Sequence, residues 1–278
     1  MIQEIGTIVQ LSLLELLAFA GPVLLIGLLL GYMEQRSNHY LQQSFGKNAI
    51  LLTAWIGVPV HEAGHLLMCW LFNHRVRKVK LLDLKADNGT LGYVEHSYSR
   101  SSLYQNMGNF FIGIGPILSG NIVLIGSMYI LLPEVFSSFS GQLSTFTGNS
   151  LLEPSIITFI AGFMGEMAAS LLNPANLANI NFWIYIFLAL GISAHIALSR
   201  EDLKGTLKGL PIMFMILLTA NFLTFIIYSD TPNAVGEIFR YNIYLLGFSI
   251  LSILFSGINL LLSYFAWSLG RKRRRSIF

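Results

Sequence analysis

The sequence predicts an all-α polytopic membrane protein with six transmembrane helices, a small β-hairpin after the second helix and an interfacial helix before the fourth. Two observations predict this class. Hydrophobic residues make up 54% of the 278 residues and charged residues only 11%, with a mean hydropathy of +0.64. Apolar runs of about 18 residues or more, close to what a helix needs to cross the hydrocarbon core, recur along the chain. We expect spans at about 8–32, 48–72, 106–132, 181–199, 209–229 and 243–268.

The chain is expected to form one integral membrane domain over 1–278. Its core would cover about 48–230, flanked by 1–47 and by 231–278, which ends in a basic tail. The N-terminal apolar run lacks the basic segment that precedes the apolar core of a secretory signal, so we expect an uncleaved first span. The single cysteine, Cys69, excludes a disulfide framework and is interpreted as a buried thiol.

The basic residues are distributed unevenly between the predicted spans. Segments 73–105, 200–208 and 271–275 carry 14 of the 17 Lys and Arg residues, and six spans place all three segments on one side. Since basic residues mark the cytoplasmic side, both termini are expected there. A seventh span at 156–172 would break this pattern, so we expect an interfacial or partly inserted helix there. Compact size and charge bias favour the bacterial cell membrane, and the net charge of +3 is too small to indicate nucleic acid binding.

The segment after the second span has a different pattern. Residues 76–84 and 90–96 are rich in β-forming side chains and flank Ala86-Asp87-Asn88-Gly89, a strong turn signal. We expect a β-hairpin here.

The second span contains His61-Glu62-Ala63-Gly64-His65. On a helix the two histidines lie about 6 Å apart along one face, where both can bind one metal ion, and Glu62 is placed to activate a water molecule. Ionisable side chains are energetically unfavourable in hydrocarbon, so their presence in a span indicates a function. The motif predicts a zinc hydrolase with its active site within the bilayer.

A catalytic zinc site usually has a third protein ligand. Under the predicted topology Glu15, His195 and Asp202 can reach the depth of the histidine pair, whereas Glu166 would lie near the outer side. Each also has a purely structural interpretation. Asp202 suits the first turn of a helix capped by Ser199, and the other two could be hydrogen-bonded inside the helix bundle.

Three sequence features resemble the site-2 protease family of intramembrane zinc metalloproteases. These are the motif at 61–65 followed by the hairpin, the Gly-Ile-Gly-Pro stretch at 113–116, and Asp-Leu-Lys-Gly at 202–205. The resemblance covers about 48–230. Two residues separate the Asp from the Gly in the last motif, where the family commonly has none, so the chain is similar to a divergent member.

The resemblance implies a membrane-embedded zinc endopeptidase that cleaves transmembrane protein substrates in or near their spans. It implies that His61, His65 and Asp202 bind Zn²⁺ and that Glu62 is the general base. We rank His195 and then Glu15 behind Asp202 as the third ligand. The alternatives are a zinc protease of another fold with a Glu as third ligand, and a non-catalytic metal-binding transporter or scaffold. A transporter is expected to space polar residues along a path, whereas this chain concentrates them at one depth.

Overall fold

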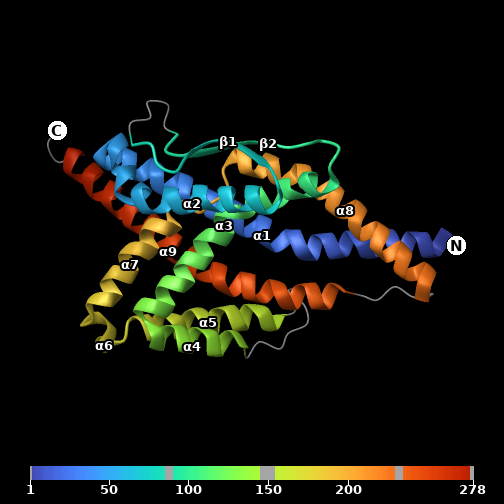
Figure 1. Ribbon diagram of the computed structural model, residues 1–278. Helices are drawn as coiled ribbons and strands as arrows, with labels where there is room; N and C mark the ends of the chain where they lie inside the picture. The colour runs from blue at the N-terminus through green and yellow to red at the C-terminus, as the bar shows by residue number, and fades with distance from the viewer. Residues whose placement is uncertain (1, 85–89, 145–153, 229–233, 276–278) are drawn as a thin grey trace.

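The computed structural model describes residues 2–84, 90–144, 154–228 and 234–275, and the chain in these ranges is mostly helical (Figure 1). In chain order the elements are α1 (Ile2–Phe45), the 3-10 turn η1 (Lys47–Ile50), α2 (Leu51–Leu71), β1 (Arg75–Lys80), β2 (Tyr93–Ser97), α3 (Leu103–Leu131), α4 (Pro133–Ser144), α5 (Pro154–Leu171), α6 (Pro174–Leu177), α7 (Ile180–Ser193), α8 (Arg200–Tyr228) and α9 (Val235–Arg275).

Within the described ranges, five helical segments are long and apolar enough to cross a membrane: Gln3–Phe45, Asn48–Leu71, Leu103–Leu131, Arg200–Tyr228 and Leu245–Gly270. They are compatible with a multi-pass integral membrane protein. They correspond to five of the six predicted spans.

The segment predicted as the fourth span, 181–199, contains a shorter helix than expected. α7 ends at Ser193 and has 14 residues, which rise about 21 Å, less than the roughly 30 Å of a hydrocarbon core. Residues 194–199 are not helical, although all but one of them are apolar or small. The next helix, α8, begins at Arg200 with its own capping residues, described below.

The first helix is longer than predicted. We expected a span at 8–32, but α1 continues through a polar segment to Phe45. It ends where Gly46 adopts a φ of 84°, a left-handed conformation that favours glycine. The chain then reverses through η1, which contacts both α1 and α2, and residues from the polar end of α1 and from α2 line one cavity.

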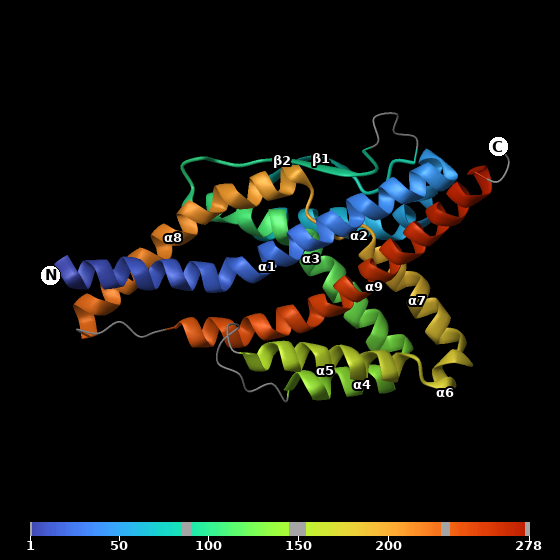
Figure 2. The ribbon, with the colours of Figure 1, turned by 180° about the vertical axis from the view of Figure 1, so that it is seen from behind.

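The predicted hairpin is confirmed. β1 and β2 pair antiparallel from Arg75 opposite Ser97 to Lys80 opposite Tyr93, with an irregularity between Val76 and Lys78. The expected turn at 86–89 lies outside the described residues. In both ribbon views the hairpin lies on one side of the molecule and α4 and α5 on the opposite side (Figures 1 and 2).

Residues 156–172 form a helix as expected, namely α5. Met167 and Leu171 of α5 are buried, whereas Met164 is 36% exposed. α4, which the sequence analysis did not predict, packs against α5, with the rings of Phe139 and Phe163 5.3 Å apart. The apolar face of α5 is therefore covered by protein.

Candidate metal centre

Helix α2 carries the two histidines and Glu62 on faces turned toward the protein. His65 and Glu62 are only 8% and 7% exposed. The helix ends because Asn73 adopts a positive φ of 56°, which lets the His74 amide bond back to the carbonyl of Cys69 at 2.8 Å. Cys69 is fully buried, as predicted for a structural thiol.

Close packing between α2 and α3 depends on glycine. A Cβ on Gly64 would lie 2.5 Å from the carbonyl oxygen of Gly115, and a Cβ on Gly115 would lie 2.7 Å from that of Gly64. On the same stretch of α3, a Cβ on Gly113 would lie 2.6 Å from the carbonyl oxygen of Asp202. The absence of side chains at these positions lets α2 and α8 both approach α3, which brings their polar residues together.

The start of α8 orients Asp202. The Ser199 amide donates to Asp202 Oδ2 at 2.8 Å, and the Asp202 amide donates to Ser199 Oγ at 3.1 Å. This reciprocal pair is a capping box in which the carboxylate occupies the third helical position. The structural interpretation of Asp202 as a helix-start carboxylate is therefore correct, and it is compatible with a ligand role because the carboxylate also reaches the histidines.

Three side chains converge at this point. His61 Nε2 lies 3.2 Å from His65 Nε2, His65 Nε2 lies 3.1 Å from Asp202 Oδ1, and His61 Nε2 lies 3.6 Å from Asp202 Oδ2. Among the described residues these three form a group that could hold a metal ion, with their ligand atoms all within 4.8 Å of one another.

Backbone carbonyls fix the proton positions of both histidines. His61 Nδ1 lies 2.6 Å from the carbonyl oxygen of His195, and His65 Nδ1 lies 2.8 Å from that of Ile112. A carbonyl oxygen can only accept, so each Nδ1 carries a proton, and the Nε2 of each ring, which faces the other ring and Asp202, is left to bind a metal ion or a second proton. Two bare Nε2 atoms at such a distance would repel each other, so either a metal ion or a proton lies between them.

These distances suit zinc. Two ligand atoms held about 2.0–2.1 Å from one tetrahedral zinc ion are about 3.3–3.4 Å apart. The three observed separations, 3.1 to 3.6 Å, lie around that value. Imidazole donors whose other nitrogen bonds a carbonyl are the arrangement commonly seen around zinc. The residues therefore fit the metal that the motif predicts.

The two alternative ligands have other partners. His195 contributes its backbone carbonyl to His61, while its ring bonds Thr53 Oγ1 at 2.9 Å and lies 3.6 Å from Glu34 Oε1. Its ring holds the non-helical segment 194–199 in place, so its contribution is to positioning.

Glu15 is buried between α1 and α8, at 3% exposure. Its Oε2 accepts from Asn221 Nδ2 at 2.7 Å, and the same amide contacts Ser12 at 3.0 Å. Neither Glu15 nor His195 belongs to the ligand group found in the described part of the chain.

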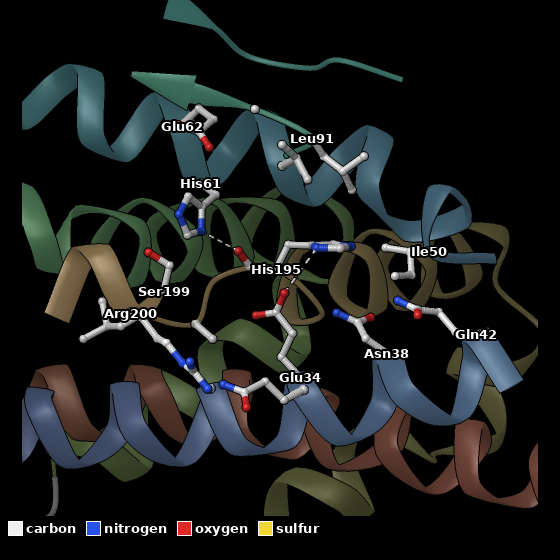
Figure 3. Close-up of a pocket in the computed structure, with 16 residues that line it drawn as sticks. Glu34, Asn38, Gln42, Ile50, His61, Glu62, Leu91, His195, Ser199 and Arg200 are labelled. Carbon is white, nitrogen blue, oxygen red and sulfur yellow. Dashed lines mark hydrogen bonds and ion pairs between the residues drawn. The ribbon is translucent and has the colours of Figure 1, made fainter. Parts of the chain in front are cut away.

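Two cavities meet at this candidate metal centre, and His61 and Glu62 line both. One, of about 490 Å³, lies beside the hairpin and is also lined by His65 and Asp202. The other, of about 500 Å³, lies between α1 and α2 (Figure 3). Glu62 is packed against the hairpin, since a Cβ on Gly92 would lie 2.7 Å from its Cγ. The carboxylate is thus held beside the ligand group, facing both cavities.

One residue that the sequence analysis did not single out, His96 of β2, lines the cavity beside the hairpin. Its Nδ1 lies 2.9 Å from His74 Nδ1, and His74 Nε2 lies 2.8 Å from the carbonyl oxygen of Gln105. Since that carbonyl requires a proton on His74 Nε2, His96 must donate from Nδ1 and keep Nε2 bare. Burial, together with the nearby His74, lowers the pKa of His96 from 6.5 to about 4. The pair is therefore neutral at physiological pH.

The spacing of β2 residues could have indicated that His96 faces the cavity beside the hairpin, because residues two apart on a strand share a face. Gly92, Val94 and His96 all line the cavity beside the hairpin. The backbone carbonyls that bind the two histidines carry no such signal in the sequence.

No family model matches this chain, and comparison with curated proteins and with solved structures gave no match.

Proposed function

We propose that the protein is an intramembrane zinc endopeptidase, a divergent member of the site-2 protease family, that hydrolyses peptide bonds in or near the spans of membrane protein substrates. The observation that carries the proposal is the convergence of His61 Nε2, His65 Nε2 and the Asp202 carboxylate beside a buried Glu62. The two Nε2 atoms lie 3.2 Å apart and both face Asp202, as the ligands of one metal ion would. A site that only binds metal would not need the Glu62 carboxylate, which lies beside the ligand group and lines both cavities.

His61, His65 and Asp202 would hold the zinc ion, which when bound would polarise the scissile carbonyl and lower the pKa of a water molecule toward neutrality. Glu62 accepts a proton from that water as its oxygen attacks the carbonyl carbon. Glu62 then donates the proton to the leaving nitrogen as the C–N bond breaks. The water supplies the hydroxyl of the new carboxyl group and one hydrogen of the new amine, and no covalent enzyme intermediate forms.

The hydrogen bonds around the ligands have a clear role in this mechanism. The carbonyls of His195 and Ile112 hold each imidazole in the tautomer that binds metal. The Ser199 amide holds one carboxylate oxygen of Asp202. These bonds fix the three ligands before metal arrives, which reduces the entropy lost on binding.

The six-span topology remains part of the proposal. α7 with the non-helical residues 194–199 would form the fourth crossing, a broken span of the kind tolerated where backbone lines a polar cavity. Both termini and the basic segments would then be cytoplasmic, as the distribution of Lys and Arg favours. The metal centre would lie at the break, within reach of water.

Substitution of Glu62 by Gln tests the catalytic role. Glu62→Gln should retain zinc and its fold but abolish cleavage of a co-reconstituted single-span reporter, because the amide cannot take the proton. Glu95→Gln, on the opposite face of β2 and 53% exposed, is the matched control and should cleave normally. Unchanged cleavage by Glu62→Gln would refute the mechanism. Zinc binding without cleavage of any single-span reporter by the unmodified chain would favour the metal-binding transporter or scaffold.

A further inference from the structure

The proposed function, on which this inference rests, creates a hydrogen-bonding problem for the substrate. A helical substrate must unwind before its carbonyl can reach the metal centre, and unwinding frees several backbone N–H and C=O groups. In a low-dielectric site each unpaired group costs a few kcal/mol. The protease therefore needs polar groups beside the metal centre that can pair with an extended backbone.

The cavity between α1 and α2, here called the α1 cavity, lies in the right place. It shares His61 and Glu62 with the metal centre and extends away from them toward Ile50. Figure 3 shows Glu34, Asn38 and Gln42 pointing from α1 into this space.

Three carboxamides line one face of α1 in this cavity: Gln35, Asn38 and Gln42. Their spacing of three and four residues places them along one side of the helix. In the described part of the chain the structure gives none of these side chains a hydrogen-bond partner. Gln43, one position further along, differs, because its amide bonds His39 at 3.0 Å and Trp267. The cavity-facing carboxamides are thus available to a ligand.

We propose that the α1 cavity binds the unwound backbone of the substrate next to the scissile bond, through the carboxamides of Asn38 and Gln42, with Gln35 nearer the metal centre. Each carboxamide offers both a donor and an acceptor, which matches the N–H and C=O of a peptide group.

The lining favours a peptide over an anionic ligand. Glu34 and Arg200 supply one charge of each sign, and Glu34 already lies 3.6 Å from the His195 ring. A phosphate or carboxylate site would instead be expected to gather several cationic groups. Neutral carboxamides that bind backbone groups do not distinguish substrate side chains. Substrates would therefore be selected by how easily their helix unwinds, rather than by their sequence.

Kinetics of carboxamide variants test the proposal. Asn38→Leu and Gln42→Leu should each raise KM for a single-span reporter by about fivefold, and the double variant by about 25-fold, because each loses a hydrogen bond to bound substrate. The kcat should change less than about twofold, and zinc content should be unchanged. Gln43→Leu is the control and should leave KM unchanged. A double variant with the KM of the unmodified chain would overturn the proposal.

A second experiment separates this inference from the proposed function. In the Glu62→Gln background, the photo-crosslinker p-benzoylphenylalanine replaces Asn38, Gln42 or, as the control, Gln43. The probe is a single-span peptide interrupted by a Gly-Pro pair, compared with an uninterrupted Leu span. Crosslinks to the interrupted peptide from positions 38 and 42, but not from 43, are expected. Crosslinks without cleavage by the unmodified chain would refute the protease function alone, whereas cleavage without crosslinks would refute the α1 cavity as the substrate site.

Discussion

The contact between Gly64 of α2 and Gly115 of α3 gives the sharpest structural prediction. In Gly115→Ala the new methyl group would lie 2.7 Å from the Gly64 carbonyl oxygen, whereas ordinary contact begins at 3.4 Å. Its neighbours are backbone atoms of α2, which cannot rotate aside as a side chain can. The two helices must therefore separate by about 0.7 Å at this point.

That separation acts directly on the proposed metal centre. The bond from His65 Nδ1 to the Ile112 carbonyl joins the same two helices at 2.8 Å, and it would lengthen to about 3.5 Å. Loss of a bond that orients a ligand typically weakens metal binding by about 10–100-fold. Overpacking also costs about 1–3 kcal/mol of stability. We expect Gly115→Ala to show both effects.

Gly126→Ala is the matched control. Gly126 lies on the same helix, and a Cβ there would meet nothing within 4 Å. Competition with a chromophoric chelator would measure zinc affinity, and thermal unfolding in detergent would measure stability. If Gly115→Ala binds zinc and unfolds like Gly126→Ala, then close α2–α3 packing does not position the ligands and the geometric argument is wrong.

Three further perturbations probe other parts of the structure. Ser199→Ala removes the capping hydroxyl of α8 and should lower the free energy of unfolding by about 1 kcal/mol. Because the backbone amide of residue 199 still holds Asp202, zinc affinity, measured by chelator competition, should fall by no more than about tenfold. Protonation should loosen the hairpin, because the pKa of His96 is about 4 when folded and 6.5 when free. Docking should be unaffected above about pH 6.5 and should weaken as the pH falls toward 4, which amide hydrogen exchange of β2 would measure. His96→Phe should reduce this pH dependence, and His74, whose pKa burial also lowers, should account for the remainder. Asn221→Leu removes the hydrogen-bond donor to buried Glu15 and should lower the free energy of unfolding by about 1–3 kcal/mol, as measured by thermal unfolding. Zinc content should be unchanged. Zinc loss in this variant would implicate Glu15 in the metal site.

Local sequence patterns predicted the parts of the site that depend on local structure. Histidines four residues apart on a helix necessarily share a face, and the Asp-Asn-Gly turn signal between two β-rich runs suited a hairpin. Asp202 was recognisable because its position three residues after Ser199 indicates a helix start. In each case the determining interactions lie within a few residues.

Other features could not be predicted because they depend on packing between distant segments. Residues 194–199 are apolar enough to continue a span, yet the chain leaves the helix there and uses the His195 carbonyl to hold His61. A backbone carbonyl is present at every residue, so the sequence does not mark this one. Asn38 and Gln42 of α1 lie beyond the span predicted at 8–32, and the sequence does not show that they share a cavity with His61 and Glu62 of α2.

Zinc content tests the central claim most directly. The purified chain should hold about one zinc ion, and Asp202→Ala should lose it, because two imidazoles alone make an incomplete site. His195→Ala and Glu15→Ala should keep zinc at the original stoichiometry. The first variant retains the backbone carbonyl that bonds His61, and the second removes a carboxylate that bonds Asn221 and not the ligand group. Zinc retained by Asp202→Ala but lost from His195→Ala would contradict the metal centre described above.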